Sequence, residues 1–99
     1  MQLQVHSIHF DADQKLIDFI KAKLGKLEQI HDKIGNAEVF LRLDNAENKE
    51  NKVAEIKLSV PGKEMFARRQ SKSFEESTDT AVEALRRQIK KHKEKTRKV

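Results

Sequence analysis

Residues 54–70, AEIKLSVPGKEMFARRQ, contain two alternating runs joined by Pro61-Gly62. The apolar residues of the first run are Ala54, Ile56, Leu58 and Val60. In the second run, residues 63–70, Met65 and Ala67 continue the alternation. Such alternation is typical of strands with one buried face, and Pro-Gly suits the two central positions of a type II turn. The stretch therefore predicts an antiparallel pair of strands with one apolar face.

Two further alternating runs lie upstream of this pair. In residues 2–9, Leu3 and Val5 point to one side and Gln4 and His6 to the other. In residues 37–43 one face carries Ala37, Val39, Leu41 and Leu43, and the other carries Glu38, Phe40 and Arg42. Both runs predict half-buried strands. Residues 44–51, DNAENKEN, are polar and turn-forming, so we expect a loop there.

Two segments have the spacing of amphipathic helices. The first follows Asp11 and Asp13, of which Asp13 is the better N-cap candidate, and runs to about His31. Its stripe is Leu16, Ile20, Leu24 and Leu27, flanked by Phe19 and Ile30. The second opens with a capping box at residues 73–76, SFEE. Its stripe is Phe74, Thr78, Ala81, Val82, Leu85 and Ile89. Each stripe predicts a helix that buries one face.

The predicted order is β-α-β-β-β-α, in one α/β (α+β) domain of 99 residues. A right-handed β-α-β crossover makes the first two strands parallel neighbours, and the remaining strands continue as an antiparallel meander. We expect a four-stranded mixed sheet with both helices on one face, because 36% hydrophobic content supports only a thin core. The domain should span residues 1–95, followed by a basic tail at residues 96–99 that frays.

Positive charge is concentrated at the end of the chain. Residues 86–99 contain eight Lys or Arg and one acid, Glu94, so they carry +7 while the whole chain carries +5. Compensation of the helix macrodipole explains two or three of these cations, and a merely solvated face usually mixes signs. On a helical projection Arg87, Lys91, Lys95 and Lys98 lie away from the apolar stripe. The pattern predicts a phosphate-rich partner, with RNA as the first candidate.

Other chemistries have little support in the sequence. The chain has no cysteine, and its three glycines belong to no phosphate-binding loop. A helix start explains Asp11 and Asp13 better than acid–base catalysis does. His6 and His9 lie on opposite faces of a strand, whereas His31 and His92 are each near a helix end with no second ligand at suitable spacing. We therefore expect no enzyme, metal, cofactor or small-molecule substrate.

A membrane or a single strand of nucleic acid fits less well than structured RNA. We find no signal peptide and no apolar run of ~20 residues, so we expect a cytoplasmic protein with no membrane partner. Of five Phe, only Phe40 and Phe66 could lie on the open sheet face for base stacking. The fold resembles that of a double-stranded RNA-binding domain, but here the last helix begins with acids, which argues against a generic duplex reader.

Two segments resemble the ribosome hibernation promoting factor family, which includes ribosome-associated inhibitor A and was once labelled sigma-54 modulation protein. They are AKLGKLE at residues 22–28 and LRRQIKKHKEK at residues 85–95. The resemblance covers essentially the whole chain. It implies a domain that binds the small ribosomal subunit, through 16S-type rRNA, in the channel for tRNA and mRNA. It further implies that this binding stops translation and promotes ribosome hibernation, a stress response of stationary phase or starvation.

Matching the two motifs position by position assigns rRNA binding to residues of both helices, and Arg86 and Lys90 join them from the same basic run. The candidate set is Lys23, Lys26, Arg86, Arg87, Gln88, Lys90, Lys91, His92, Lys93 and Lys95. The chain resembles the short form of the family, so we expect a monomer that does not join ribosomes by its own dimerisation. The alternative is a DNA-associated or transcription-modulating basic protein.

Overall fold

The computed structural model describes residues 1–44 and 49–97, with side chains as far as Glu94. Its elements are β1 (Gln2–Ser7), α1 (Gln14–Ile30), β2 (Asn36–Leu43), β3 (Lys52–Val60), β4 (Lys63–Ser71) and α2 (Phe74–Arg97). The predicted order β-α-β-β-β-α and the α+β class are confirmed. The proposed domain boundary after residue 95 stays a prediction, and α2 continues to Arg97. Residues 98–99 lie outside the described part.

The four strands form one mixed sheet in the order β1-β2-β3-β4. β1 pairs with β2 in parallel, whereas β2–β3 and β3–β4 are antiparallel, as the crossover argument predicts. The register places Val5 beside Val39, Val39 beside Ile56, and Ile56 beside Ala67. Apolar side chains of the same parity therefore cross the sheet in a row and give it one apolar face.

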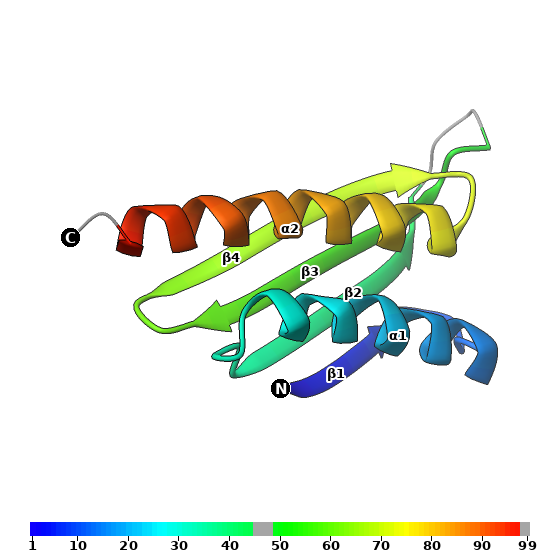
Figure 1. Cartoon of the computed structure of the whole chain (residues 1–99). Helices are drawn as coiled ribbons and strands as arrows, with labels where there is room; N and C mark the ends of the chain where they lie inside the picture. The colour runs from blue at the N-terminus through cyan, green and yellow to red at the C-terminus, as the bar shows by residue number, and fades with distance from the viewer. Residues whose placement is uncertain (45–48, 98–99) are drawn as a thin grey trace.

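Both helices cover that apolar face and run side by side in the same direction, α1 over β1 and β2 and α2 over β3 and β4 (Figure 1). The largest side chains of the core come from both helices and the sheet, and Ile20, Leu24, Leu85 and Ile89 are completely buried. The opposite face of the sheet carries no helix among the described residues. The C-terminal ends of α1 and α2 consequently lie at the same end of the molecule.

The local signals in the sequence set the helix starts. Asp13 Oδ1 accepts a hydrogen bond from the N–H of Leu16 at 2.8 Å, and Ser73 Oγ accepts one from the N–H of Glu76 at 3.1 Å. The predicted capping box is only half formed, because the Ser73 N–H donates to Ser71 Oγ at 3.4 Å instead of to the Glu76 side chain. At the β3–β4 turn Gly62 has φ 77°, as the second central residue of a type II turn requires.

Two residues differ from the burial that their predicted faces imply. Leu43 follows the inward parity of β2 but is 52% exposed, because it pairs with Lys52 in the last rung of the ladder, where the apolar layer ends. Val53 lies on the open face of the sheet yet is fully buried, flanked in the register by the long side chains of Arg42 and Gln70.

The loop predicted after β2 lies where the polar stretch places it. A hydrogen bond from the Asp44 N–H to the Asn51 carbonyl at 2.8 Å closes its base. Residues 45–48 of the predicted loop lie outside the described part.

Candidate nucleic-acid interface

Helix α2 lies over the sheet because its apolar stripe continues as far as Ile89, just inside the basic half of the helix, residues 86–97. Ala81, Val82, Leu85 and Ile89 are buried, and Phe74 packs half-buried with its ring stacked on Phe10. The first turn carries Glu75 and Glu76, which suit the positive end of the helix dipole. The charge of the helix thus changes sign along its length, and the cations gather where α2 lies beside the end of α1.

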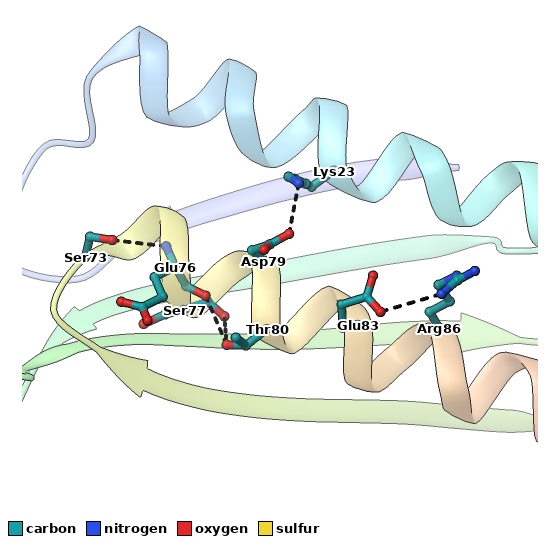
Figure 2. A network of polar contacts seen from close by, with 8 residues as sticks. All are labelled: Lys23, Ser73, Glu76, Ser77, Asp79, Thr80, Glu83 and Arg86. Atoms are coloured by element: carbon teal, nitrogen blue, oxygen red, sulfur yellow. Dashed lines mark hydrogen bonds and ion pairs between the residues drawn. The ribbon is translucent and has the colours of Figure 1, made fainter.

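A groove of about 430 Å³ runs between the two helices. It is lined by Lys23, Lys26, Leu27, Gln29, Ile30, Asp79, Val82, Glu83 and Arg86. Lys23 Nζ lies 2.9 Å from an Asp79 carboxylate oxygen and so joins α1 to α2 across the groove, and Arg86 lies 3.6 Å from Glu83 (Figure 2). Lys26 is exposed at the same groove. The structure thus brings Lys23 and Lys26 together with Arg86, which lies about sixty residues further along the sequence.

A second, smaller hollow continues from the groove toward the end of α2. Its volume is about 230 Å³, and Ile30, Lys90, Lys93 and Glu94 line it. Ile30 borders both hollows. The cations Arg86, Lys90 and Lys93 recur at spacings of four and three along α2, so one side of the helix presents them in a row toward α1.

Arg87 and Lys91 occupy a different side of α2. Both are exposed, and Arg87 Nε donates a hydrogen bond to the Glu83 carbonyl at 3.4 Å. Their place away from the apolar stripe is as the helical projection predicts. The side chains of Lys95 and Lys98, which the projection puts on the same side, lie outside the described part. The basic surface is therefore wider than one stripe and extends from the groove over the outer side of α2.

Three candidate residues make contacts within the protein that the sequence did not reveal. Gln88 Nε2 donates to the Phe66 carbonyl of β4 at 3.0 Å, and Lys93 Nζ donates to the Ile30 carbonyl at the end of α1 at 2.6 Å. The ring of His92 stacks on that of His31, with centroids 6.2 Å apart. The contact between the two histidines could not be predicted, because spacing along the chain does not show which helix ends meet.

Features that would indicate a metal site or a membrane span are missing from the described residues. Within residues 1–44 and 49–94, no three His, Asp or Glu side chains come together as a metal site would require. Neither helix, over its described length, is long and apolar enough to span a membrane. His6 lies 3.6 Å from Glu38 and stacks on Phe40 on the open face of the sheet.

The open sheet face differs from the helix face in its charge balance. Glu55, whose side chain is 15% exposed, forms ion pairs with both Arg42 and Arg68, and Lys57 lies 3.9 Å from Glu64. Phe66 is 47% exposed there, and Phe40 shares the face as expected. Because its cations face carboxylates, this face attracts phosphate less than the basic half of α2 does.

Comparison with known proteins identifies the family. The family described as "Sigma 54 modulation protein / S30EA ribosomal protein" matches residues 3–97, and the chain belongs to it. A ribosome hibernation promoting factor of Pseudomonas putida is 33% identical over 95 residues, which cover 96% of this chain and 89% of that protein. Proteins of the same name from Klebsiella oxytoca and Escherichia coli K12 are each 30% identical, with 96% of both chains covered.

Solved structures show the same fold. A ribosomal subunit interface protein from Coxiella burnetii superposes with a TM-score of 0.83 at 22% identity, over 94% of this chain and 98% of that one. The N-terminal domain of Thermus thermophilus Protein Y gives 0.81 at 22% identity, over 93% and 99%. The resemblance to a double-stranded RNA-binding domain stays a prediction, since neither of these neighbours is named as one.

Proposed function

We propose that the protein binds the small ribosomal subunit through 16S-type rRNA, occupies the tRNA and mRNA channel, and promotes ribosome hibernation in stationary phase or starvation. The observation that carries this proposal is the basic surface built from both helices, in a chain whose relatives are named ribosome hibernation promoting factors. A ribosomal partner gives the protein a cytoplasmic location. We take it to be a monomer when free.

The mechanism is occupancy. Cations in the groove and on the outer side of α2 neutralise rRNA phosphates and release their counterions, which supplies most of the affinity. The sheet and its two helices form a rigid body that excludes tRNA anticodon stems and message from the space it fills. Because the action is steric, no bond is made or broken, and no catalytic group is needed.

The competing hypothesis, a DNA-associated or transcription-modulating protein, has no support beyond the first half of the family's description. The relatives named above are named for hibernation. A competition assay separates the two. Small subunits carrying the bound protein are challenged with excess duplex DNA at equal phosphate concentration, and the protein should stay on the subunits.

The experiment that tests the proposal compares two charge-reversal variants. Arg87→Glu with Lys91→Glu changes the exposed side of α2, and Lys49→Glu with Lys57→Glu makes the same change of charge in the 44–51 loop and on the open sheet face. Sedimentation through sucrose with purified small subunits should show loss of binding for the first variant only. Retention of the first variant, or equal loss in both, would refute this surface.

A second readout tests occupancy. The wild-type protein should displace tRNA from small subunits programmed with message. The protein concentration that displaces half of the tRNA should match the concentration that half-saturates the subunits. The α2 variant should not displace tRNA at concentrations where the control variant does. Simultaneous binding of tRNA and the protein to one subunit would contradict the steric mechanism.

A further inference from the structure

Helix α2 has little apolar attachment over its basic half. Ile89 is the last buried residue among those described as far as Glu94, and Lys90, Lys91 and Lys93 are exposed. Like charges three and four residues apart destabilise a helix by a few tenths of a kcal/mol per pair. Contacts other than core packing must therefore hold this part of α2 in place.

Gln88 supplies one such contact. β4 is an edge strand of the sheet, so its outward carbonyls have no partner strand within the described residues. The Gln88 side chain donates from Nε2 to the Phe66 carbonyl at 3.0 Å and satisfies one of them. This bond ties α2 to the edge of the sheet at the start of the basic run, next to Arg87.

Lys93 and His92 supply the contacts at the other end of the run. α1 has no basic residue in its last turn, and its final residue, Ile30, has a carbonyl without an intrahelical partner. Lys93 Nζ lies 2.6 Å from that carbonyl, at the negative end of the α1 dipole. His31, whose Nδ1 accepts the Lys33 N–H at 3.1 Å, holds its ring against that of His92.

We propose that Gln88, His92 and Lys93 are positioning residues, which fix the basic half of α2 against β4 and α1 and do not themselves bind rRNA. Phosphate contacts are left to the remaining exposed cations at the groove, at the second hollow and on the outer side of α2, which are Lys26, Arg86, Arg87, Lys90 and Lys91. This inference rests on the proposed function, and it divides the motif at residues 85–95 into residues that hold the helix and residues that meet the partner.

The test compares Lys93→Met and Lys91→Met, which remove the same charge at positions two residues apart, together with Gln88→Leu. Binding of the full chain to small subunits is measured over a range of salt concentrations. Lys91→Met should lower the slope of log affinity against log salt by about 0.7 to 0.9, the value of one phosphate contact. Gln88→Leu and Lys93→Met should keep the parental slope and lose roughly two- to tenfold in affinity at every salt concentration.

Amide hydrogen exchange supplies a readout that does not depend on the ribosome. Exchange at the end of α1 and after Ile89 in α2 should become faster in Lys93→Met and Gln88→Leu, and stay parental in Lys91→Met. A slope change in Lys93→Met equal to that in Lys91→Met, with parental exchange, would overturn the assignment. Failure of the wild-type protein to bind small subunits would refute the proposed function. The positioning role is tested separately, since wild-type exchange rates in both Lys93→Met and Gln88→Leu would overturn it.

Discussion

The salt dependence of ribosome binding can be worked out from the exposed cations. Among the described side chains, and apart from Lys93, which bonds to the Ile30 carbonyl, five exposed cations lie at the groove, at the second hollow or on the outer side of α2: Lys26, Arg86, Arg87, Lys90 and Lys91. Each phosphate contact contributes about 0.7 to 0.9 to the slope of log affinity against log salt, so five contacts give a slope of about −3.5 to −4.5. Raising monovalent salt from ~50 to ~200 mM should then weaken binding roughly one hundred- to five hundredfold.

Fluorescence anisotropy measures this slope directly. Because the chain has no cysteine, Lys49→Cys provides a single dye site at an exposed position between β2 and β3, away from the basic half of α2. Titrations with purified small subunits at constant Mg²⁺ keep the particle intact while monovalent salt changes. Arg87→Gln with Lys91→Gln should lower the slope by about 1.4 to 1.8, the value of two phosphate contacts. Two phosphate contacts alone would give a slope of about −1.4 to −1.8. A wild-type slope shallower than about −1 would therefore show that phosphate neutralisation does not supply the affinity for the small subunit.

Three further predictions concern stability and can be checked by urea unfolding. Leu24→Ala removes a fully buried side chain between α1 and the sheet and should lower the free energy of unfolding by about 2 to 5 kcal/mol, so a loss below ~1 kcal/mol would contradict the packing. Asp13→Ala removes the N-cap of α1 and should lower the free energy of unfolding by about 1 kcal/mol, whereas Asp11→Ala should change it little. Equal losses in the two variants would contradict the assigned cap. Gly62→Ala should lower the free energy of unfolding by about 1 to 2 kcal/mol, because φ is positive at this residue. Gly25→Ala should raise it by about 0.5 to 1 kcal/mol, because the added methyl group has open space around it within a helix. A change of the same sign in both variants would be inconsistent with the structure.

The elements and the core face could be predicted because their signals are local. Alternation around Pro61-Gly62 sets a hairpin, and a stripe ending at Leu27 sets the buried side of α1, without knowledge of the rest of the chain. The exposure of Leu43 and the burial of Val53 could not be predicted in this way. They depend on where the helix layer ends and on which side chains of neighbouring strands lie alongside, and both follow from the register.

In the candidate site, too, local features could be predicted from the sequence and contacts between distant residues could not. Exposure of Arg87 and Lys91 follows from helical periodicity within one segment, so the sequence predicts it. The contacts of Gln88 and Lys93 join residues 22 and 63 positions apart, and periodicity carries no information on such pairs. Sequence reasoning therefore places the cations on the surface but does not distinguish those that hold α2 in place.

Cross-linking from single cysteines tests most directly whether the basic helix meets the ribosome. Glu94→Cys places a photo-reactive maleimide beside the cations of α2, and Glu64→Cys places it on the opposite sheet face with the same change of charge. Position 94 should cross-link to small-subunit rRNA, and position 64 should do so weakly or not at all. Efficient rRNA cross-links from position 64 with none from position 94 would contradict the assignment of the helix face.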